Sequence, residues 1–237
     1  MWMNIVVDSE TENLIAFLNT FKGKTVEELS DCTNYYTTSK SKNALLIKKI
    51  EEGFKGKEYF KTLSEINNLC TKTIPLLENG TAKEAMSFPY FNYESIVKES
   101  WDTSVTKNMF SKTFIFCPFQ IKGSEIIFRG AFLWKMPDNI LNGEIKKVWE
   151  KTKNIIVNGN IVKEDGAKLI LNFPRESESK ICHVRPHGRD SLDLAKLPKR
   201  DVTTNYIGLP KQCFWLNHGY VNDIIKQYSD SDITFIN

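Results

Sequence analysis

Side chains that suit nucleic-acid recognition are concentrated in one short stretch, residues 181–190, which reads ICHVRPHGRD. Its first residues have the β-branched character of a strand. A strand that ends at Arg185-Pro186 and then turns at a glycine would project Arg185, His187 and Arg189 from a rigid end into a loop. Arginine makes bidentate contacts with phosphate and guanine. The stretch is therefore a candidate DNA-reading rim, and a solvated basic loop is the alternative.

A tryptophan near the end of the sequence lies in a setting that suits base stacking. The string LPKQCFWLNH, residues 209–218, places Trp215 among polar residues just before a helical pattern. An indole in this position can wedge or stack against a base. Asn217 and His218 follow it and add hydrogen-bonding groups. The alternative is that Trp215 packs in the core.

A single lysine interrupts the apolar and β-branched run LCTKTIP, residues 69–75. Turn signals lie on both sides of the run, so it is predicted to form one strand. Lys72 either takes part in chemistry there or covers the solvated face of that strand. The types and spacing of the residues alone leave both alternatives open.

Several common catalytic and metal-binding patterns are absent from the sequence. No GxxxxGK[ST], GxGxxG, HExxH or GxSxG string occurs, which removes the simple nucleotide, zinc-protease and hydrolase interpretations. His183 and His187 lie four residues apart, but Pro186 between them argues against a helical metal site. The five cysteines are scattered without CxxC spacing, which predicts reduced thiols.

The elements that must position these residues change from helical to strand-like and back along the chain. Apolar stripes predict helices at 10–21 and 44–54, and a capping-box pattern at Thr25 opens a short helix between them. Helical periodicity returns at 139–157 and 219–228. Strands are predicted at 69–76, 86–93, 113–120, 126–133, 167–172 and 181–184. This order predicts one mixed α/β domain with a central sheet flanked by helices.

The composition of the chain is that of a soluble globular protein. It has 237 residues, 41% hydrophobic and 26% charged, which is enough for a sizeable core. No apolar run approaches the roughly 20 residues of a membrane span, and no signal-peptide pattern opens the sequence, so a cytoplasmic location is expected. The net charge of +3 is too small to identify a polyanionic partner, but four of the five arginines fall between Arg175 and Arg200.

Several of these strings, taken together, resemble the MutH family. This family comprises the nicking enzyme of mismatch repair, which acts at hemimethylated GATC, and type II restriction endonucleases that cut GATC. The similar strings occur in family order between about residue 14 and residue 225: FKGKTVEEL (21–29), KTIP (72–75), WDTS (101–104), HVRP (183–186), LP (209–210) and FWL (214–216). The resemblance implies a restriction-endonuclease-like fold, α/β (mixed α+β), that binds double-stranded DNA.

The resemblance also implies that the family's catalytic constellation is degenerate here. Active members bind Mg²⁺ with an aspartate and with the glutamate of a Glu-x-Lys string, whose lysine helps to orient the attacking water. Matching KTIP puts Lys72 at that lysine and Cys70 at that glutamate, and a thiol is a poor ligand for Mg²⁺. Only Glu58 and Glu65 are candidates for the upstream carboxylate, and Glu52 is the expected match for an accessory glutamate. We therefore expect no catalytic residue, no metal and no cofactor in this domain.

The positions that read DNA in the family are altered as well. His187 stands where the mismatch-repair enzyme has a lysine after its Arg-Pro, and Trp215 stands where it has a tyrosine that probes adenine. Lys107 and Lys112 fall where the family has basic residues and are expected to contact phosphate. The expected DNA-binding residues are Arg185, His187, Arg189, Trp215, Asn217, His218, Lys107 and Lys112.

Some GATC restriction endonucleases of this group resemble two such domains in tandem. Their C-terminal copy lacks the carboxylates and binds a second, effector DNA site. The present sequence is most similar to that copy, so we expect one MutH-like regulatory domain over residues 1–237 within a longer enzyme of a restriction-modification system. An N-terminal catalytic domain and a homodimer on DNA are the expected partners. The alternatives are an active Mg²⁺-dependent endonuclease that recruits Glu52, Glu58 or Glu65, and a structural or dimerisation module.

Overall fold

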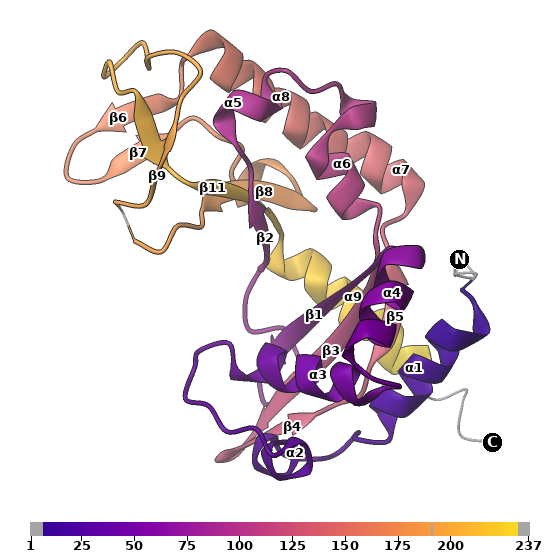
Figure 1. Cartoon of the computed structure of the whole chain (residues 1–237). Helices are drawn as coiled ribbons and strands as arrows, with labels where there is room; N and C mark the ends of the chain where they lie inside the picture. The colour runs from indigo at the N-terminus through magenta and orange to yellow at the C-terminus, as the bar shows by residue number, and fades with distance from the viewer. Residues whose placement is uncertain (1–6, 191, 232–237) are drawn as a thin grey trace. The chain divides into compact units, whose positions relative to one another are not determined.

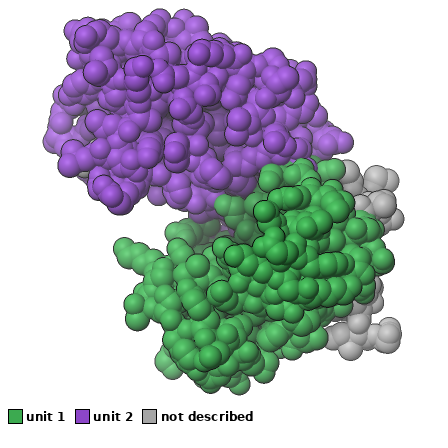
Figure 2. All heavy atoms as spheres, viewed as in Figure 1, with its two compact units in different colours: residues 1–84, 112–136, 225–237 green, residues 85–111, 137–224 purple. Residues whose placement is uncertain are grey.

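The computed structural model describes residues 7–190 and 192–231 (Figure 1). The chain forms two compact units, and each is assembled from separate segments of the sequence (Figure 2). Their residues are 1–84, 112–136 and 225–237 for unit 1, and 85–111 and 137–224 for unit 2. The expectation of one MutH-like domain over the whole chain stays a prediction.

Unit 1 is built on a four-stranded mixed sheet. Its central strand is β3 (Thr113–Lys122), and β1 (Leu69–Leu76) pairs with it in parallel along one edge. Two shorter strands, β4 (Glu125–Phe128) and β5 (Phe132–Lys135), pair antiparallel with β3. The predicted strands at 69–76 and 113–120 are therefore confirmed.

The break between β4 and β5 replaces the single strand predicted at 126–133. Gly130 lies in this break with φ of +97°, a conformation that favours glycine. A Cβ on Gly130 would lie 2.6 Å from Oδ1 of Asn19. That Oδ1 accepts a hydrogen bond from the Ala131 backbone N–H at 2.8 Å, and the Asn19 amide donates to the Ala131 carbonyl at 3.0 Å. The bend is thus stabilised by a side chain that is distant in sequence.

Four helices pack with one face of this sheet (Figure 1). They are α1 (Ser9–Asn19), α2 (Val26–Thr33), α3 (Lys42–Gly53) and α4 (Lys57–Ile66). Their buried side chains join the strands in a single apolar cluster that includes Leu18, Ile50, Ile115 and Phe119. The capping box at Thr25 forms as predicted. The sequence did not predict α4, because Leu63 is the one residue of this polar helix that is buried.

The opposite face of the sheet carries aromatic side chains. Phe116 and Trp134 stack across β3 and β5 with ring centroids 5.3 Å apart. Phe132 stacks on Tyr228 of α9 (His218–Ser231) at 4.0 Å. The part of α9 that begins at Ile225 belongs to unit 1, and its Tyr228 packs on this face of the sheet.

Unit 2 contains a three-stranded antiparallel sheet in the order β2-β11-β8. The strands are β2 (Met86–Tyr90), β11 (Gln212–Leu216) and β8 (Cys182–Pro186). Two further antiparallel pairs are β6 (Val162–Asp165) with β7 (Leu169–Leu171), and β9 (Leu194–Lys196) with β10 (Gly208–Pro210). The predicted strand at 86–93 ends early, because the Asn92 side chain caps the helix that follows it.

Short helices and one long helix complete unit 2. The helices are α5 (Tyr93–Ile96), η1 (Trp101–Thr103), α6 (Val105–Phe110), α7 (Asp138–Ile140), the π-helical η2 (Leu141–Ile145), α8 (Lys146–Asn158) and η3 (Glu176–Glu178). The predicted helix at 139–157 is therefore confirmed, with a π-helical turn near its start. None of the described helices is long and apolar enough to cross a membrane.

The fold class is mixed α/β with a central mixed sheet flanked by helices. This architecture is consistent with a restriction-endonuclease-like fold, and it confirms the prediction of fold class.

Candidate nucleic-acid interface

Three of the predicted DNA-binding residues form one cluster in unit 2. Strands β8 and β11 pair with His183 opposite Trp215 and with Arg185 opposite Cys213, so these residues share one face of the sheet. The guanidinium carbon of Arg185 lies 4.3 Å from the Trp215 ring centroid. The His187 ring meets the same indole edge-on at a centroid distance of 5.4 Å. We call Arg185, His187 and Trp215 the recognition cluster.

Backbone hydrogen bonds position the recognition cluster at the end of β8. The His187 backbone N–H donates to the Lys211 carbonyl at 3.0 Å, and the Lys211 N–H donates to the Asp193 carbonyl at 3.2 Å. Lys211 also forms an ion pair with Asp193 at 2.7 Å, and this carboxylate accepts from the Arg189 backbone N–H at 3.0 Å. The loop after β8 is thus tied to the start of β11.

Asn217 supports this cluster from a buried position. Its side chain is 3% exposed, and its amide donates to the Ser179 carbonyl at 2.6 Å. Its Oδ1 lies 2.7 Å from Nδ1 of His183, which is also 3% exposed. An amide oxygen can only accept, so Nδ1 of His183 carries the proton. His183 in turn stacks on Trp215 at 6.4 Å. This placement suits Asn217 to hold the cluster in position, and the predicted contact with DNA stays untested.

The other predicted DNA-binding residues of unit 2 lie outside the cluster. The Arg189 side chain is 86% exposed and pairs with Asp190 at 3.2 Å. His218 begins α9, and its backbone N–H donates to the Glu176 carboxylate at 3.3 Å. Lys107 of α6 forms an ion pair with Asp102 at 2.6 Å. These three side chains remain predicted contacts.

The KTIP string forms the last part of β1 in unit 1. Side chains alternate along a strand, so Cys70 and Lys72 share one face and Thr71 lies on the other. The Thr71 hydroxyl donates to the carboxylate of Glu51 on α3. Glu51 therefore approaches the face of β1 opposite to Cys70 and Lys72.

Glu51, rather than Glu52, is the glutamate that α3 buries against the sheet. It is 3% exposed, and burial raises its pKa to about 7, although the Thr71 hydrogen bond lowers it. Glu52 is half-buried and pairs with Lys49 at 3.0 Å, and this hydrogen bond lowers its pKa. The sequence reasoning missed Glu51, yet its position four residues after Ile47 places it on the apolar stripe of the helix.

The residues around β1 do not fit the Mg²⁺ site that the family resemblance implies. Burial raises the pKa of the Cys70 thiol, against smaller lowering effects of Lys72 and Lys112, so a neutral sulfur stands where a carboxylate would be needed. Glu58 and Glu65 lie on α4 with exposed side chains. Within residues 7–190 and 192–231, no group of three or more His, Cys, Asp or Glu residues is arranged to hold a metal ion.

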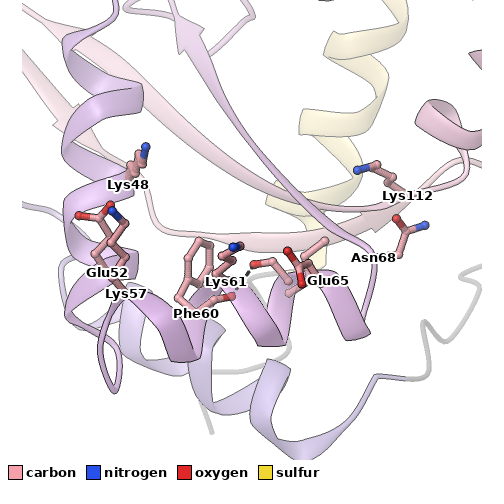
Figure 3. Close-up of a pocket in the computed structure, with 10 residues that line it drawn as sticks. Lys48, Glu52, Lys57, Phe60, Lys61, Glu65, Asn68 and Lys112 are labelled. Atoms are coloured by element: carbon pink, nitrogen blue, oxygen red, sulfur yellow. Dashed lines mark hydrogen bonds between the residues drawn. The ribbon is translucent and has the colours of Figure 1, made fainter. Parts of the chain in front are cut away.

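A cavity of about 540 Å³ opens between α3 and α4, beside the start of β1 (Figure 3). Lysines contribute much of its charged lining: Lys48, Lys57, Lys61 and Lys112. We call the cavity with these four side chains the lysine groove. It contains one predicted DNA-binding residue, Lys112, which belongs to unit 1, whereas Lys107 belongs to unit 2. The structure thus assigns these two lysines to different units.

The chain is similar to a known restriction enzyme. The type II restriction enzyme Sau3AI of Staphylococcus aureus is 30% identical to it over 199 residues, which cover 70% of this chain and 39% of that enzyme. The chain thus matches less than half of the length of this curated relative. No protein-family model matches the chain. The similarity supports the restriction-enzyme part of the resemblance seen in the sequence, while the MutH-type and C-terminal assignments stay predictions.

Proposed function

We propose that this chain binds double-stranded DNA and acts as a regulatory, effector-site domain of a type II restriction endonuclease without cleaving DNA itself. The observation that carries the proposal is the recognition cluster, in which Arg185 and His187 contact the Trp215 ring beside the paired strands β8 and β11. The similarity to a type II restriction enzyme supports it. GATC is the proposed recognition sequence because the family resemblance implies it.

The recognition cluster suits DNA because its side chains are already arranged before binding. An arginine stacked on an indole keeps its planar fork of donors oriented, so less side-chain entropy is lost when it contacts phosphate or guanine. Arg185 is exposed, and Trp215 is half-buried. His187 adds an imidazole that can donate or accept a hydrogen bond at a base edge. The three groups together offer charge, stacking and hydrogen bonding at one place.

The geometry of β1 supports a role without cleavage. A dication needs oxygen ligands that converge on one point. Here Cys70 supplies sulfur, and Glu51 reaches the opposite face of the strand through Thr71. An endonuclease built on Lys72 would need carboxylates on the face that Cys70 occupies. The alternative of an active enzyme therefore has less support than a binding role.

DNA bound to a regulatory domain can activate a catalytic domain only by binding more tightly when that catalytic domain is in its active state. The difference in binding free energy between the two states limits the activation. We propose that DNA bound at the recognition cluster supplies this preference, with a catalytic domain N-terminal to this one in the same full-length chain. A homodimer on DNA would bring two such sites together. These assignments rest on the family resemblance.

Fluorescence anisotropy with a labelled GATC duplex at low salt tests the proposal. We expect a complex that weakens steeply as salt rises, because phosphate contacts release counterions. Arg185→Ala should weaken binding by about 1–3 kcal/mol, a factor of ten or more. Arg129→Ala, which removes an exposed arginine of unit 1, is the matched control and should leave binding unchanged. The absence of any complex, or equal losses in both variants, would refute DNA binding at the cluster.

Incubation with supercoiled plasmid and Mg²⁺ tests the non-cleaving part. We expect the plasmid to remain intact, because β1 lacks the convergent carboxylates. Nicking by the unaltered chain that disappears in Lys72→Ala would establish the endonuclease alternative instead.

A further inference from the structure

The lysine groove of unit 1 is separate from the recognition cluster and has an excess of positive charge. Glu52 and Glu65 line it beside the four lysines, so two formal positive charges remain. The net charge of the whole chain is +3. In Figure 3 the charged side chains come from both sides of the cavity, with Lys48 on α3, Lys61 on α4 and Lys112 ahead of β3. The groove thus concentrates a charge that is comparable to that of the entire protein.

The four lysines of the groove form no close ion pair, although Glu52 attracts Lys48 and Lys57 at longer range. Among the residues that the structure describes, none of the four has a carboxylate within 4.0 Å. Glu52 is matched by Lys49, which lies outside the lining, at 3.0 Å. Four lysines that converge on two carboxylates without a close ion pair repel one another, and an anion between them offsets this repulsion.

The rest of the lining strengthens the attraction for an anion. Phe60 and the buried Leu69 contribute apolar surface, which lowers the local dielectric and so increases the interaction of charges. Asn68 adds an amide that can donate a hydrogen bond, whereas the Ser64 hydroxyl already donates to the Phe60 carbonyl at 2.8 Å. Asn68 and Lys112 lie near one end of the groove, and Lys48 and Lys57 lie toward the other (Figure 3).

We propose that the lysine groove binds the phosphate group of an anionic ligand directly through its ammonium groups, without a metal ion. A phosphate presents several oxygen acceptors and carries enough negative charge to offset the excess of the lining. The phosphate belongs either to a free phosphate species or to a nucleic-acid phosphodiester. This site lies within unit 1 and does not depend on the proposed role of the recognition cluster.

Isothermal titration calorimetry with inorganic phosphate, at low salt and in EDTA, measures this site directly. The test variant is Lys48→Gln with Lys112→Gln, which removes one charge from each side of the groove. The control is Lys40→Gln with Lys122→Gln, two exposed lysines of unit 1 outside the lining with the same total charge change. We expect the unaltered chain to bind phosphate saturably. The affinity of the groove variant should be at least about tenfold lower, and that of the control should stay within about twofold of the unaltered chain.

A second titration, by anisotropy with a labelled duplex that lacks GATC, identifies the source of the phosphate. If the duplex displaces inorganic phosphate and binds the groove variant more weakly than the control, the natural ligand is a DNA phosphodiester. If the groove variant loses phosphate binding but keeps its affinity for the duplex, the ligand is a free phosphate species. Both outcomes support an anion site. Circular dichroism melting of each variant confirms that the chain remains folded.

Two outcomes would overturn the inference. The first is no saturable phosphate binding by the unaltered chain, and the second is an equal loss in the groove variant and its control. Arg185→Ala separates this test from the proposed function. It should weaken binding of the GATC duplex and leave the phosphate isotherm unchanged. A chain that binds GATC through Arg185 but does not bind phosphate would reject the groove alone.

Discussion

Glu51 should make the protein less stable as the pH rises toward neutrality, and Glu51→Gln should remove this dependence. The carboxyl group is buried between α3 and β1, and this burial raises its pKa from an ordinary 4.5 to about 7. The folded state therefore holds the proton more tightly than the unfolded state does. Stability falls between about pH 4.5 and pH 7, and above pH 7 the loss is complete.

The size of the effect follows from the pKa shift. Each unit corresponds to 1.36 kcal/mol, so a rise from 4.5 to about 7 costs about 3 kcal/mol once the group is ionised in both states. A change of this size shifts the melting temperature of a chain of this length by about 6–12 °C. Glutamine has nearly the same shape as the neutral carboxyl and keeps an acceptor for Thr71.

Thermal and urea denaturation at pH 5 and pH 8 measure this effect. We expect Glu51→Gln to gain about 2.5 kcal/mol over the unaltered chain at pH 8 relative to pH 5, because part of the loss has already occurred at pH 5. Glu52→Gln on the same helix is the control. It should lower the stability rather than raise it, because the hydrogen bond from Lys49 lowers the pKa of Glu52 and so stabilises the ionised carboxylate in the folded state. Equal effects of Glu51→Gln at the two pH values would refute the burial argument.

Three further changes test unit 2. Asn217→Ala removes the acceptor of buried His183 and should destabilise the fold by about 1–3 kcal/mol in urea denaturation. Asp201→Ala should lower the melting temperature strongly, because this buried carboxylate accepts hydrogen bonds from four backbone N–H groups. Burial raises the pKa of Asp201, but these donors outweigh that effect and hold the pKa below 3.8. The stability that Asp201 contributes is therefore lost as the pH falls below that value. Trp215→Phe should keep part of the stacking surface for Arg185 and retain more affinity for the GATC duplex than Trp215→Ala does in anisotropy.

Strands β1 and β3 of the main sheet were predictable because their signals are local. The β-branched run at 69–76 lies between turn signals, and it forms β1 with those bounds. The capping box at Thr25 likewise specifies the start of α2 through contacts within one helical turn. Such features depend on residues that are close together in the sequence.

The features that the sequence did not reveal depend on distant partners. Helix α4 is polar and buries only Leu63, so its position depends on packing against the rest of unit 1. The bend at Gly130 depends on Asn19, more than a hundred residues away. The recognition cluster was predicted as three separate residue types, but the contact of Arg185 with Trp215 follows from the register of β8 against β11, which no single segment specifies.

The groups around β1 carry less negative charge than a cation site needs. A site for Mg²⁺ must concentrate negative charge, whereas here the Cys70 thiol is neutral at physiological pH because burial raises its pKa. Glu51 is about half protonated at neutral pH because its pKa is about 7, and it contacts the other face of the strand. The lysine groove beside these residues adds positive charge through side chains such as Lys112, which also lowers the pKa of Cys70. Each feature weakens the attraction for a dication and strengthens the attraction for phosphate. This balance fits the proposed role of a domain that holds DNA without cutting it, because its phosphate contacts would then be made by the protein's own cations.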